Sequence, residues 1–202
     1  MGVSSKDFEN MLSRVQGKAA KDAPSKENLS FVAPEPGQTI LGVDPSLRGT
    51  GYGVIKVANP VSEVLTMGVI KCPQSWKRSQ CLAAISSKMR KLVKDHSPQV
   101  CVIESLFYAQ NYRTALTMGE ARGASLAAIA EGGLTIYELA PRKVKQAIVG
   151  YGAAQKEAVA KMVQRMLQLD EVPQEDAADA LALALTHVQI HVPGSLNQPK
   201  PL

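Results

Sequence analysis

The sequence predicts an α/β sandwich in which a mixed five-stranded sheet is flanked by helices. Two observations predict it. Three short apolar runs follow one another with only short connections between them, which favours an antiparallel meander. Later apolar runs alternate with longer segments of helical spacing, which favours strands added in parallel to the same sheet.

Five apolar runs bounded by turn residues predict buried strands. They are TILGVD (39–44), GYGVIKV (51–57), SEVLTMGVIKC (62–72), QVCVIES (99–105) and LTIYEL (134–139). The first is followed by the loop PSLRGTG, and Asn59-Pro60 separates the second from the third. The run 39–44 ends at a turn signal, so we expect its last residue at the edge of the sheet.

Two long helices are predicted between the later strands. Residues 76–95 carry apolar residues on one helical face: Leu82, Ile85, Met89, Leu92 and Val93. Residues 111–131 form an Ala-rich helix that ends at Gly132-Gly133. Beyond the last strand, the rest of the domain is predicted to be helical.

The Ala-rich helix carries small residues four apart: Ala115, Gly119, Gly123 and Ala127. Small side chains in a row let another backbone approach closely. The partner is either the sheet of the same chain or a second copy of the helix, and packing on the sheet is the more common arrangement in soluble domains.

Composition and charge divide the chain of 202 residues into three parts. The total charge is 23 − 18 = +5, which hints at a polyanionic partner. Residues 1–37 form an extension whose second half, rich in Ala, Pro, Ser and charge, is typical of a linker. Residues 38–192 form the folded domain, and 193–202 is a Pro-broken tail that we expect to be disordered.

The first part of the extension leaves two interpretations open. Apolar residues recur there at helical spacing: Phe8, Met11, Leu12 and Val15. This favours either a short amphipathic helix that docks on a partner or, more simply, a frayed extension without a fixed role.

Several protein classes are excluded by the same survey. No run of 18 apolar residues exists, so no membrane span is expected, and the first residues lack a secretory h-region. Cys72, Cys81 and Cys101 form no CxxC pair. They favour reduced, buried thiols in a cytoplasmic protein.

Four carboxylates stand out because of their positions. Asp44 and Glu104 end two buried strands, and Asp176 and Asp179 lie in the first turn of the helical run EDAADALALALTH. Each has an ordinary explanation as a turn residue, a cap, or an acid that complements the helix dipole. Together, at two strand ends and one helix start, they predict a site for hard cations such as Mg²⁺.

Several motifs, and their order along the chain, resemble those of the RuvC family of Holliday junction resolvases. The motifs are ILGVDPSLRGTGYGVI, VIESLFYAQN, EARG, APRKVKQAIVG with YGAAQKEAV, and PQEDAADALALALTH, from about residue 39 to 190. The resemblance implies an RNase H-like three-layer sandwich. It also implies a homodimer that resolves four-way DNA junctions by paired symmetric nicks in recombination and repair, and it raises the expectation that the Ala-rich helix contributes to the dimer.

The resemblance assigns roles to residues of this chain. It makes Asp44, Glu104, Asp176 and Asp179 the catalytic acids, holding two Mg²⁺ per subunit with Mn²⁺ as a substitute. It places basic residues near the cut strand: Lys145, Lys156, Arg142 and Lys143. From spacing alone, Lys145 and Lys156 fit a solvated helix face equally well. RuvA and RuvB branch-migration proteins are the implied partners.

Phe107 matches the family aromatic that stacks on bases near the junction centre. The adjacent Tyr108 cannot be separated from it by sequence, and a loop aromatic tucked into the core is the alternative. Two positions depart from the family pattern: Ser46 stands where many members have Gly, and Gln110 where some have Lys. A positive φ at Ser46 would strain the turn.

Two other functions are weighed. The segment GVDPSLRGTGYGV is similar to the first phosphate loop of actin-like and sugar-kinase-like ATPases, but these need a second similar domain that the chain does not hold. An inactive junction-binding protein is the non-enzymatic alternative, against which the presence of all four acids argues.

Overall fold

The computed structural model describes residues 34–106, 112–190 and 201–202, all within one unit, Val32–Leu202. Its sheet contains strands β1 (Thr39–Asp44), β2 (Gly49–Lys56), β3 (Glu63–Lys71), β4 (Val100–Glu104) and β5 (Thr135–Leu139). Their order is β3-β2-β1-β4-β5. β1, β2 and β3 pair antiparallel, and β4 and β5 are added in parallel. The predicted mixed five-stranded sheet is therefore confirmed.

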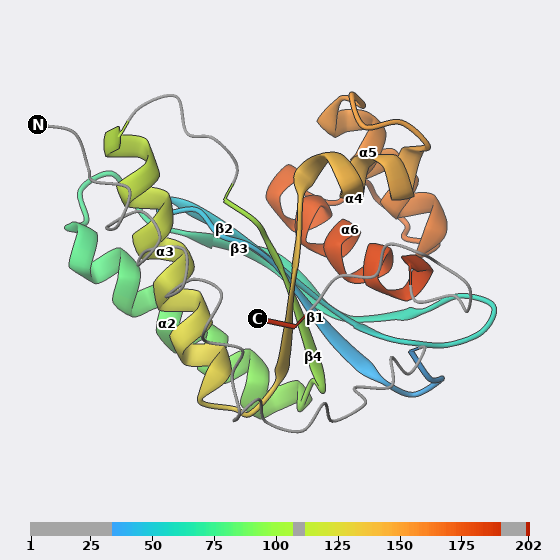
Figure 1. Cartoon of the computed structure of the whole chain (residues 1–202), viewed down its shortest axis with the longest axis horizontal. Helices are drawn as coiled ribbons and strands as arrows, with labels where there is room; N and C mark the ends of the chain where they lie inside the picture. The colour runs from blue at the N-terminus through green and yellow to red at the C-terminus, as the bar shows by residue number, and fades with distance from the viewer. Residues whose placement is uncertain (1–33, 107–111, 191–200) are drawn as a thin grey trace, which may run out of the picture. The chain divides into compact units, whose positions relative to one another are not determined.

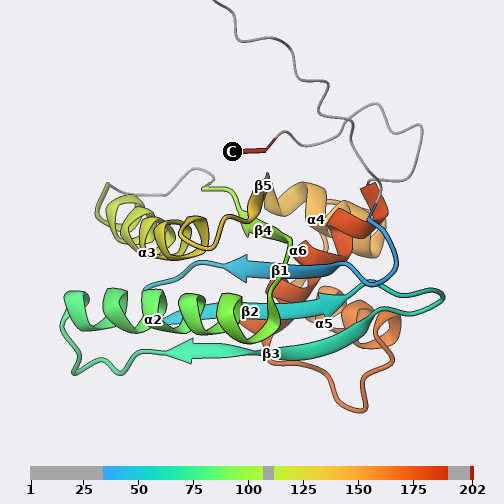
Figure 2. The same cartoon turned by 90° about the horizontal axis from the view of Figure 1, so that it is seen from below.

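Helices cover both faces of this sheet (Figures 1 and 2). On one face lie α2 (Arg78–His96) and α3 (Tyr112–Ala130). On the other lie α4 (Pro141–Val149), α5 (Lys156–Met166) and α6 (Glu175–Ile190). None of the described helices is both long and apolar enough to cross a membrane.

The period-2 pattern of β1 divides the core into two clusters. Ile40 packs with α4, α5 and α6, whereas Leu41 and Val43 pack with α2 and α3. All three residues have no exposed surface. Because successive side chains of a strand point to opposite faces, a nearly continuous apolar run fits a strand covered on both sides.

The row of small residues on α3 does not pack on the sheet, so this part of the sequence prediction is wrong. Ala115, Gly123 and Ala127 are exposed, and Gly119 is only partly covered. Other residues make the buried face of the helix: Ala121, Ser125, Ala128 and Ile129. Ala121, Ser125 and Ile129 each lie two positions after a residue of the row, which turns them to a different face of the helix.

Two smaller expectations can also be checked. All three cysteines are free and buried, as predicted. The last two residues lie against β5, where the Leu202 amide donates to the Ile136 carbonyl oxygen at 2.9 Å. At these two positions the structure differs from the expected disordered tail. Residues 193–200 and the extension up to residue 33 lie outside the described residues.

Candidate active site

Two carboxylates meet at one edge of the sheet because β1 and β4 are parallel neighbours. Val43 and Ile103 are register partners, so the next residues, Asp44 and Glu104, lie side by side at the strand ends. The two carboxyl groups are joined by a hydrogen bond. Parallel strands thus deliver to one edge two acids that are 60 residues apart in the sequence.

The first turn of α6 brings the other two acids to the same edge. In β2, Gly51 is the register partner of Asp44. A side chain at Gly51 would overlap the backbone carbonyl oxygen of Asp176, and one at Gly42 would overlap that of Ala180. The missing side chains let the backbone of α6 lie directly on β1 and β2, and this close approach carries Asp176 and Asp179 to the site.

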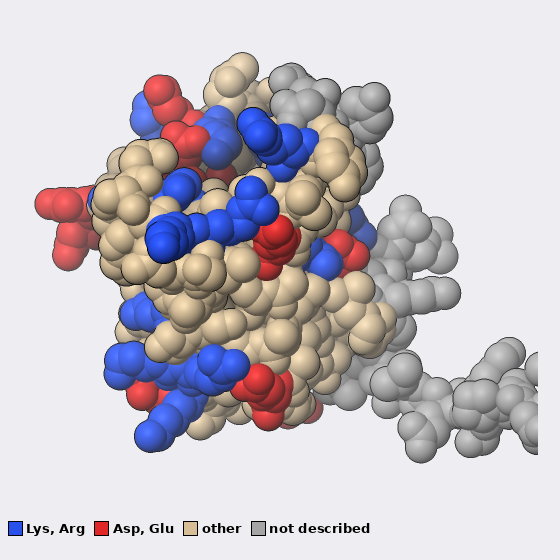
Figure 3. Space-filling model, turned by 90° about the vertical axis from the view of Figure 1, so that its left-hand side faces the viewer, with Lys and Arg blue, Asp and Glu red and all other residues tan. Residues whose placement is uncertain are grey.

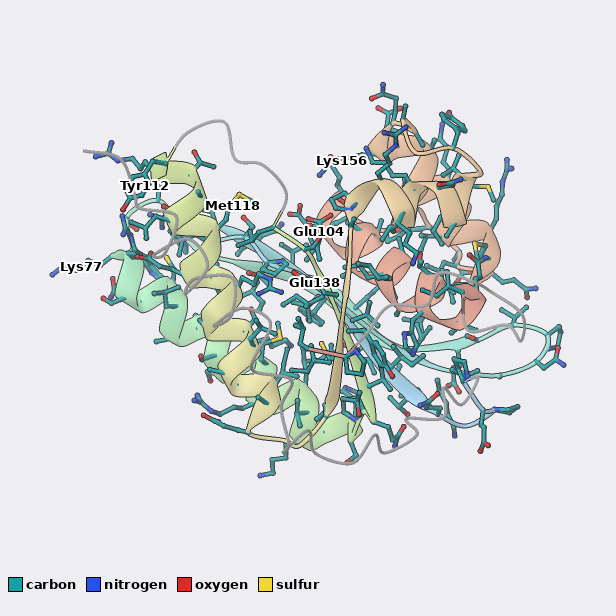
Figure 4. All side chains as sticks on the ribbon, in the orientation of Figure 1. Lys77, Glu104, Tyr112, Met118, Glu138 and Lys156 are labelled. Carbon is teal, nitrogen blue, oxygen red and sulfur yellow. The ribbon has the colours of Figure 1, made fainter. Side chains whose placement is uncertain are left out.

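All four predicted acids line one cleft of about 340 Å³, together with Lys145 and Lys156. The structure therefore brings together the carboxylates that the sequence singles out. Figure 4 shows Glu104 and Met118 on the α3 side of this region and Lys156 on the side of α4 and α5. The cleft is open to solvent and lies between the helices of the two sheet faces.

Burial makes the charged forms of Asp44, Glu104 and Asp179 costly. It raises the pKa of Asp44 to about 8, with further contributions from the charges of Glu104 and Asp179. It also raises the pKa values of Glu104 and Asp179. The hydrogen bond between Asp44 and Glu104 favours a protonated Asp44 and a charged Glu104, so Asp44 carries the shared proton. A cation in the cleft would relieve this repulsion.

Lys156 neutralises part of the site from the start of α5. Its Nζ lies 2.7 Å from Glu175 Oε1 and 3.2 Å from Asp179 Oδ2. Although partial burial alone would lower the pKa of Lys156, its hydrogen bonds to these carboxylates raise it. Lys156 is half exposed at the start of α5, and its ion pair with Asp179 joins it to a carboxylate of the cleft.

Arg142 and Lys143 are not brought into the cleft. Arg142 is exposed, and its side chain lies against Gly152. Lys143 is half-buried on α4 and does not line the cleft. Phe107, Tyr108 and Gln110 lie outside the described residues, so their predicted roles stay predictions.

The turn after Asp44 shows no strain at Ser46. The described non-glycine residues with positive φ are Ser97 and Gln168. The Ser46 amide donates to Thr50 Oγ1 at 3.2 Å, and that hydroxyl donates to the Ser46 carbonyl oxygen at 2.5 Å. The departure from glycine at this position therefore leaves the turn intact.

Sequence reasoning missed one residue that supports the site. Arg122 of α3 donates from Nη2 to Glu138 Oε1 at 2.6 Å and from Nε to the Glu104 carbonyl oxygen at 3.4 Å. Its side chain is only 15% exposed. Arg122 therefore ties the end of β4 to β5 and α3. The EARG motif contains this arginine, but its partner Glu138 carries no signal in the sequence.

The chemistry of the donor set fits a hard divalent cation. All four acids offer carboxylate oxygens, which Mg²⁺ prefers, and they share one cleft. Within the described parts of the chain, no three His, Cys, Asp or Glu side chains stand at the spacing of ligands to a single ion.

The model of the family described as crossover junction endodeoxyribonuclease RuvC matches residues 40–187. The chain belongs to the RuvC family. Its members are nucleases that depend on divalent metal ions, and the mixed sheet with flanking helices is the RNase H-like fold of this family.

Individual RuvC proteins match most of the chain. The crossover junction endodeoxyribonuclease RuvC of Akkermansia muciniphila is 44% identical over 149 residues, covering 74% of this chain and 89% of the relative. That of Chromohalobacter salexigens is 45% identical over 148 residues, covering 73% and 79%. The structure of Thermus thermophilus RuvC in complex with a Holliday junction substrate is 33% identical with a TM-score of 0.75, covering 82% of this chain and 99% of that one.

Proposed function

We propose that the chain is a Holliday junction resolvase that cuts four-way DNA junctions by paired symmetric nicks during recombination and repair. The observation that carries this proposal is the cleft in which four carboxylates from three separate segments meet. Its RuvC membership supports the substrate, since the Thermus thermophilus relative was solved with a Holliday junction. Neither an ATPase nor an inactive binding protein has a comparable observation in its favour.

In this proposal Asp44, Glu104, Asp176 and Asp179 are the catalytic acids and hold two Mg²⁺ ions, with Mn²⁺ as a substitute. When bound, the ions would lower the pKa of the attacking water and stabilise the leaving oxygen of the phosphodiester. Two groups of the chain would make way for the ions: Asp44 would lose the proton that its raised pKa favours, and Lys156 would leave Asp179.

Lys156 and Lys145 would then face the phosphate of the cut strand. Both line the cleft, and a lysine released from its carboxylate partner can balance the negative charge that develops at the phosphate. Arg142 and Lys143 are assigned to phosphates farther along the same strand, because α4 places them outside the cleft. Phe107 and Tyr108 are assigned to the bases at the junction centre.

The assembly in this proposal is a homodimer, which presents two sites to the two strands of a junction. The exposed small residues of α3 support it, because they leave room for a second helix. RuvA and RuvB are the proposed partners, and the cytoplasm is the proposed compartment. The extension 1–37 and the tail 193–202 flank the nuclease domain 38–192.

The test compares wild type with Asp44→Asn on a mobile four-way junction in Mg²⁺. We expect wild type to give paired symmetric nicks and Asp44→Asn to bind the junction without cutting it. Asp95→Asn is the matched control, because Asp95 is an exposed acid that pairs with Lys91 at the end of α2. Cutting by Asp44→Asn at the wild-type rate would contradict the assignment, and ATP hydrolysis without nicking would favour the ATPase.

A further inference from the structure

One stretch of the chain is basic without a single acid. Between Glu63 and Asp95 the sequence has seven Lys and Arg residues and no Asp or Glu, whereas the whole chain carries only +5. This stretch covers β3, α2 and the loop between them. Such a run attracts polyanions, provided that its charges are not already used inside the protein.

The structure separates the engaged charges from the available ones. Arg78 and Arg90 pair with Glu120 and Glu131 of α3, and Lys91 pairs with Asp95. Lys88 lies over the ring of Tyr52. Lys71, Lys77 and Lys94 are exposed, and no carboxylate of the described residues lies within ion-pairing distance of any of them. Lys94 lies in the last turn of α2, whereas Lys71 and Lys77 flank the β3–α2 loop.

These two lysines lie at the edge of the sheet that holds the cleft. Lys71 ends β3 and is the register partner of Gly49 in β2. A β-carbon added to Gly49 would lie 2.9 Å from Asp176 Oδ2, so Gly49 adjoins a carboxylate of the site. Lys71 pairs with Gly49 and therefore lies one strand farther from that carboxylate. Lys77 precedes α2, on the side of the molecule shown in Figure 3. On that face Lys and Arg occupy more of the surface than Asp and Glu.

Arg48 fixes the loop that carries these lysines. It lies in the turn after Asp44, and its carbonyl oxygen accepts from the Cys72 amide at 3.0 Å. Its guanidinium donates to the carbonyl oxygens of Pro73, at 2.5 Å, and Trp76, at 3.2 Å. The loop is thus ordered before any partner binds, which lowers the entropic cost of association.

The same bonds hold Trp76 at the surface, where it is 39% exposed. A large aromatic side chain beside unpaired lysines is the combination that nucleic-acid surfaces use: the charges bind phosphate, and the ring packs on sugar or base.

We propose that the β3–α2 loop, residues 71–77, is a second DNA-binding surface that holds the duplex next to the cut strand. Lys71 and Lys77 contact backbone phosphates, and Trp76 packs beside them. The contacts are to the backbone and therefore independent of sequence; they position the junction against the carboxylate cleft. This inference rests on the proposed junction-cutting function.

The test measures junction affinity against salt concentration in metal-free buffer for wild type and Lys71→Ala/Lys77→Ala. The control is Lys56→Ala/Lys94→Ala, which removes the same charge from two exposed lysines outside the loop, one at the end of β2 and one in the last turn of α2. We expect the salt slope to fall by about 2 in the first variant, with roughly tenfold weaker binding, and to stay at the wild-type value in the control. Thermal unfolding verifies that both variants are folded.

Three outcomes would overturn the proposal. If the two double variants bind the junction equally more weakly than wild type, only the total charge matters. If both bind it as tightly as wild type, the loop is not in contact with DNA. In both cases wild type still binds and cuts junctions, so the proposed function stands. If wild type itself fails to bind a junction, the proposed function and this surface fall together.

Discussion

The two faces of the sheet are covered by different kinds of packing. On one face α6 lies on Gly42 and Gly51, with backbone against backbone. On the other face α2 packs through large side chains, among them Ile85, Met89 and Leu92, all buried. The first arrangement leaves no space to adjust, whereas the second can repack around a changed side chain.

The difference follows from what each face must position. The first turn of α6 carries Asp176 and Asp179, whose placement against Asp44 decides whether the carboxylates form one site. Contact between the backbones of α6 and the sheet fixes the position of Asp176 and Asp179 relative to Asp44, and this contact does not depend on side-chain rotamers. The α2–α3 face carries none of the four acids; from it Met118 lines the cleft, and Arg122 donates a hydrogen bond to the Glu104 carbonyl oxygen.

The largest effect is expected from Gly51→Ala. The new methyl group overlaps the Asp176 carbonyl oxygen, so α6 must move away from β2. We expect the free energy of unfolding to fall by about 3 kcal/mol or more, and cleavage to be lost even where the protein is folded. Denaturant unfolding and a junction cleavage assay measure the two quantities.

Met89→Ala is the matched change on the other face. Met89 is fully buried against the sheet, so its truncation costs about 2–5 kcal/mol. Cleavage by the folded protein is expected to stay near the wild-type rate. If Gly51→Ala and Met89→Ala lose equal cleavage activity, the two faces do not differ in how strictly they position the site.

Arg122→Ala tests the hydrogen-bonded link from the α2–α3 face to the site. Losing the bonds to Glu138 and to the Glu104 carbonyl oxygen releases the end of β4. We expect kcat to fall by about 10–100-fold with little change in KM, as for other residues that support metal ligands, and Arg122→Lys to recover part of it. Arg90→Ala, which breaks the exposed pair with Glu131, should leave both constants unchanged.

Asp44→Asn is expected to stabilise the metal-free protein. The pKa of Asp44 is raised from 3.8 to about 8, so its charged form costs folding energy. The cost is absent below pH 3.8 and grows as pH rises towards 8. We expect a gain of about 2 kcal/mol at pH 8 and a smaller one at pH 5.5, less than the full shift because the buried site relaxes. If Asp44→Asn raises the free energy of unfolding equally at both pH values, the gain comes from packing and not from the removed charge.

Local sequence patterns predicted the strands because buried strands here are continuous apolar runs. β1 matches its predicted bounds, whereas β2 begins at Gly49, two residues early, because pairing with Lys71 extends it past the predicted loop. The four acids were predictable because each interrupts or begins an apolar element.

The rest depends on contacts between distant segments. The approach of α6 to Gly51, the bond from Arg122 to Glu138, and the hold of Arg48 on the β3–α2 loop all join residues that no local period relates. The prediction that the small residues of α3 pack on the sheet was wrong for the same reason. Their spacing indicates close packing but does not identify the partner, and in the structure they are exposed or only partly covered.

The smallest effect is expected from Gly123→Ala on α3. Nothing lies within 4 Å of the added methyl group, so no contact of the chain opposes it. Alanine loses less backbone entropy in a helix, and the gain in stability is about 0.5–1 kcal/mol. In the proposed homodimer the same methyl group faces a second copy, so dimerisation weakens although the fold is more stable. Thermal unfolding measures the stability and sedimentation measures the association. A more stable protein with unchanged association would place the dimer contact elsewhere than on the small-residue row. Gly123→Ala thus tests the exposed face of α3, as Gly51→Ala tests the contact between α6 and the sheet.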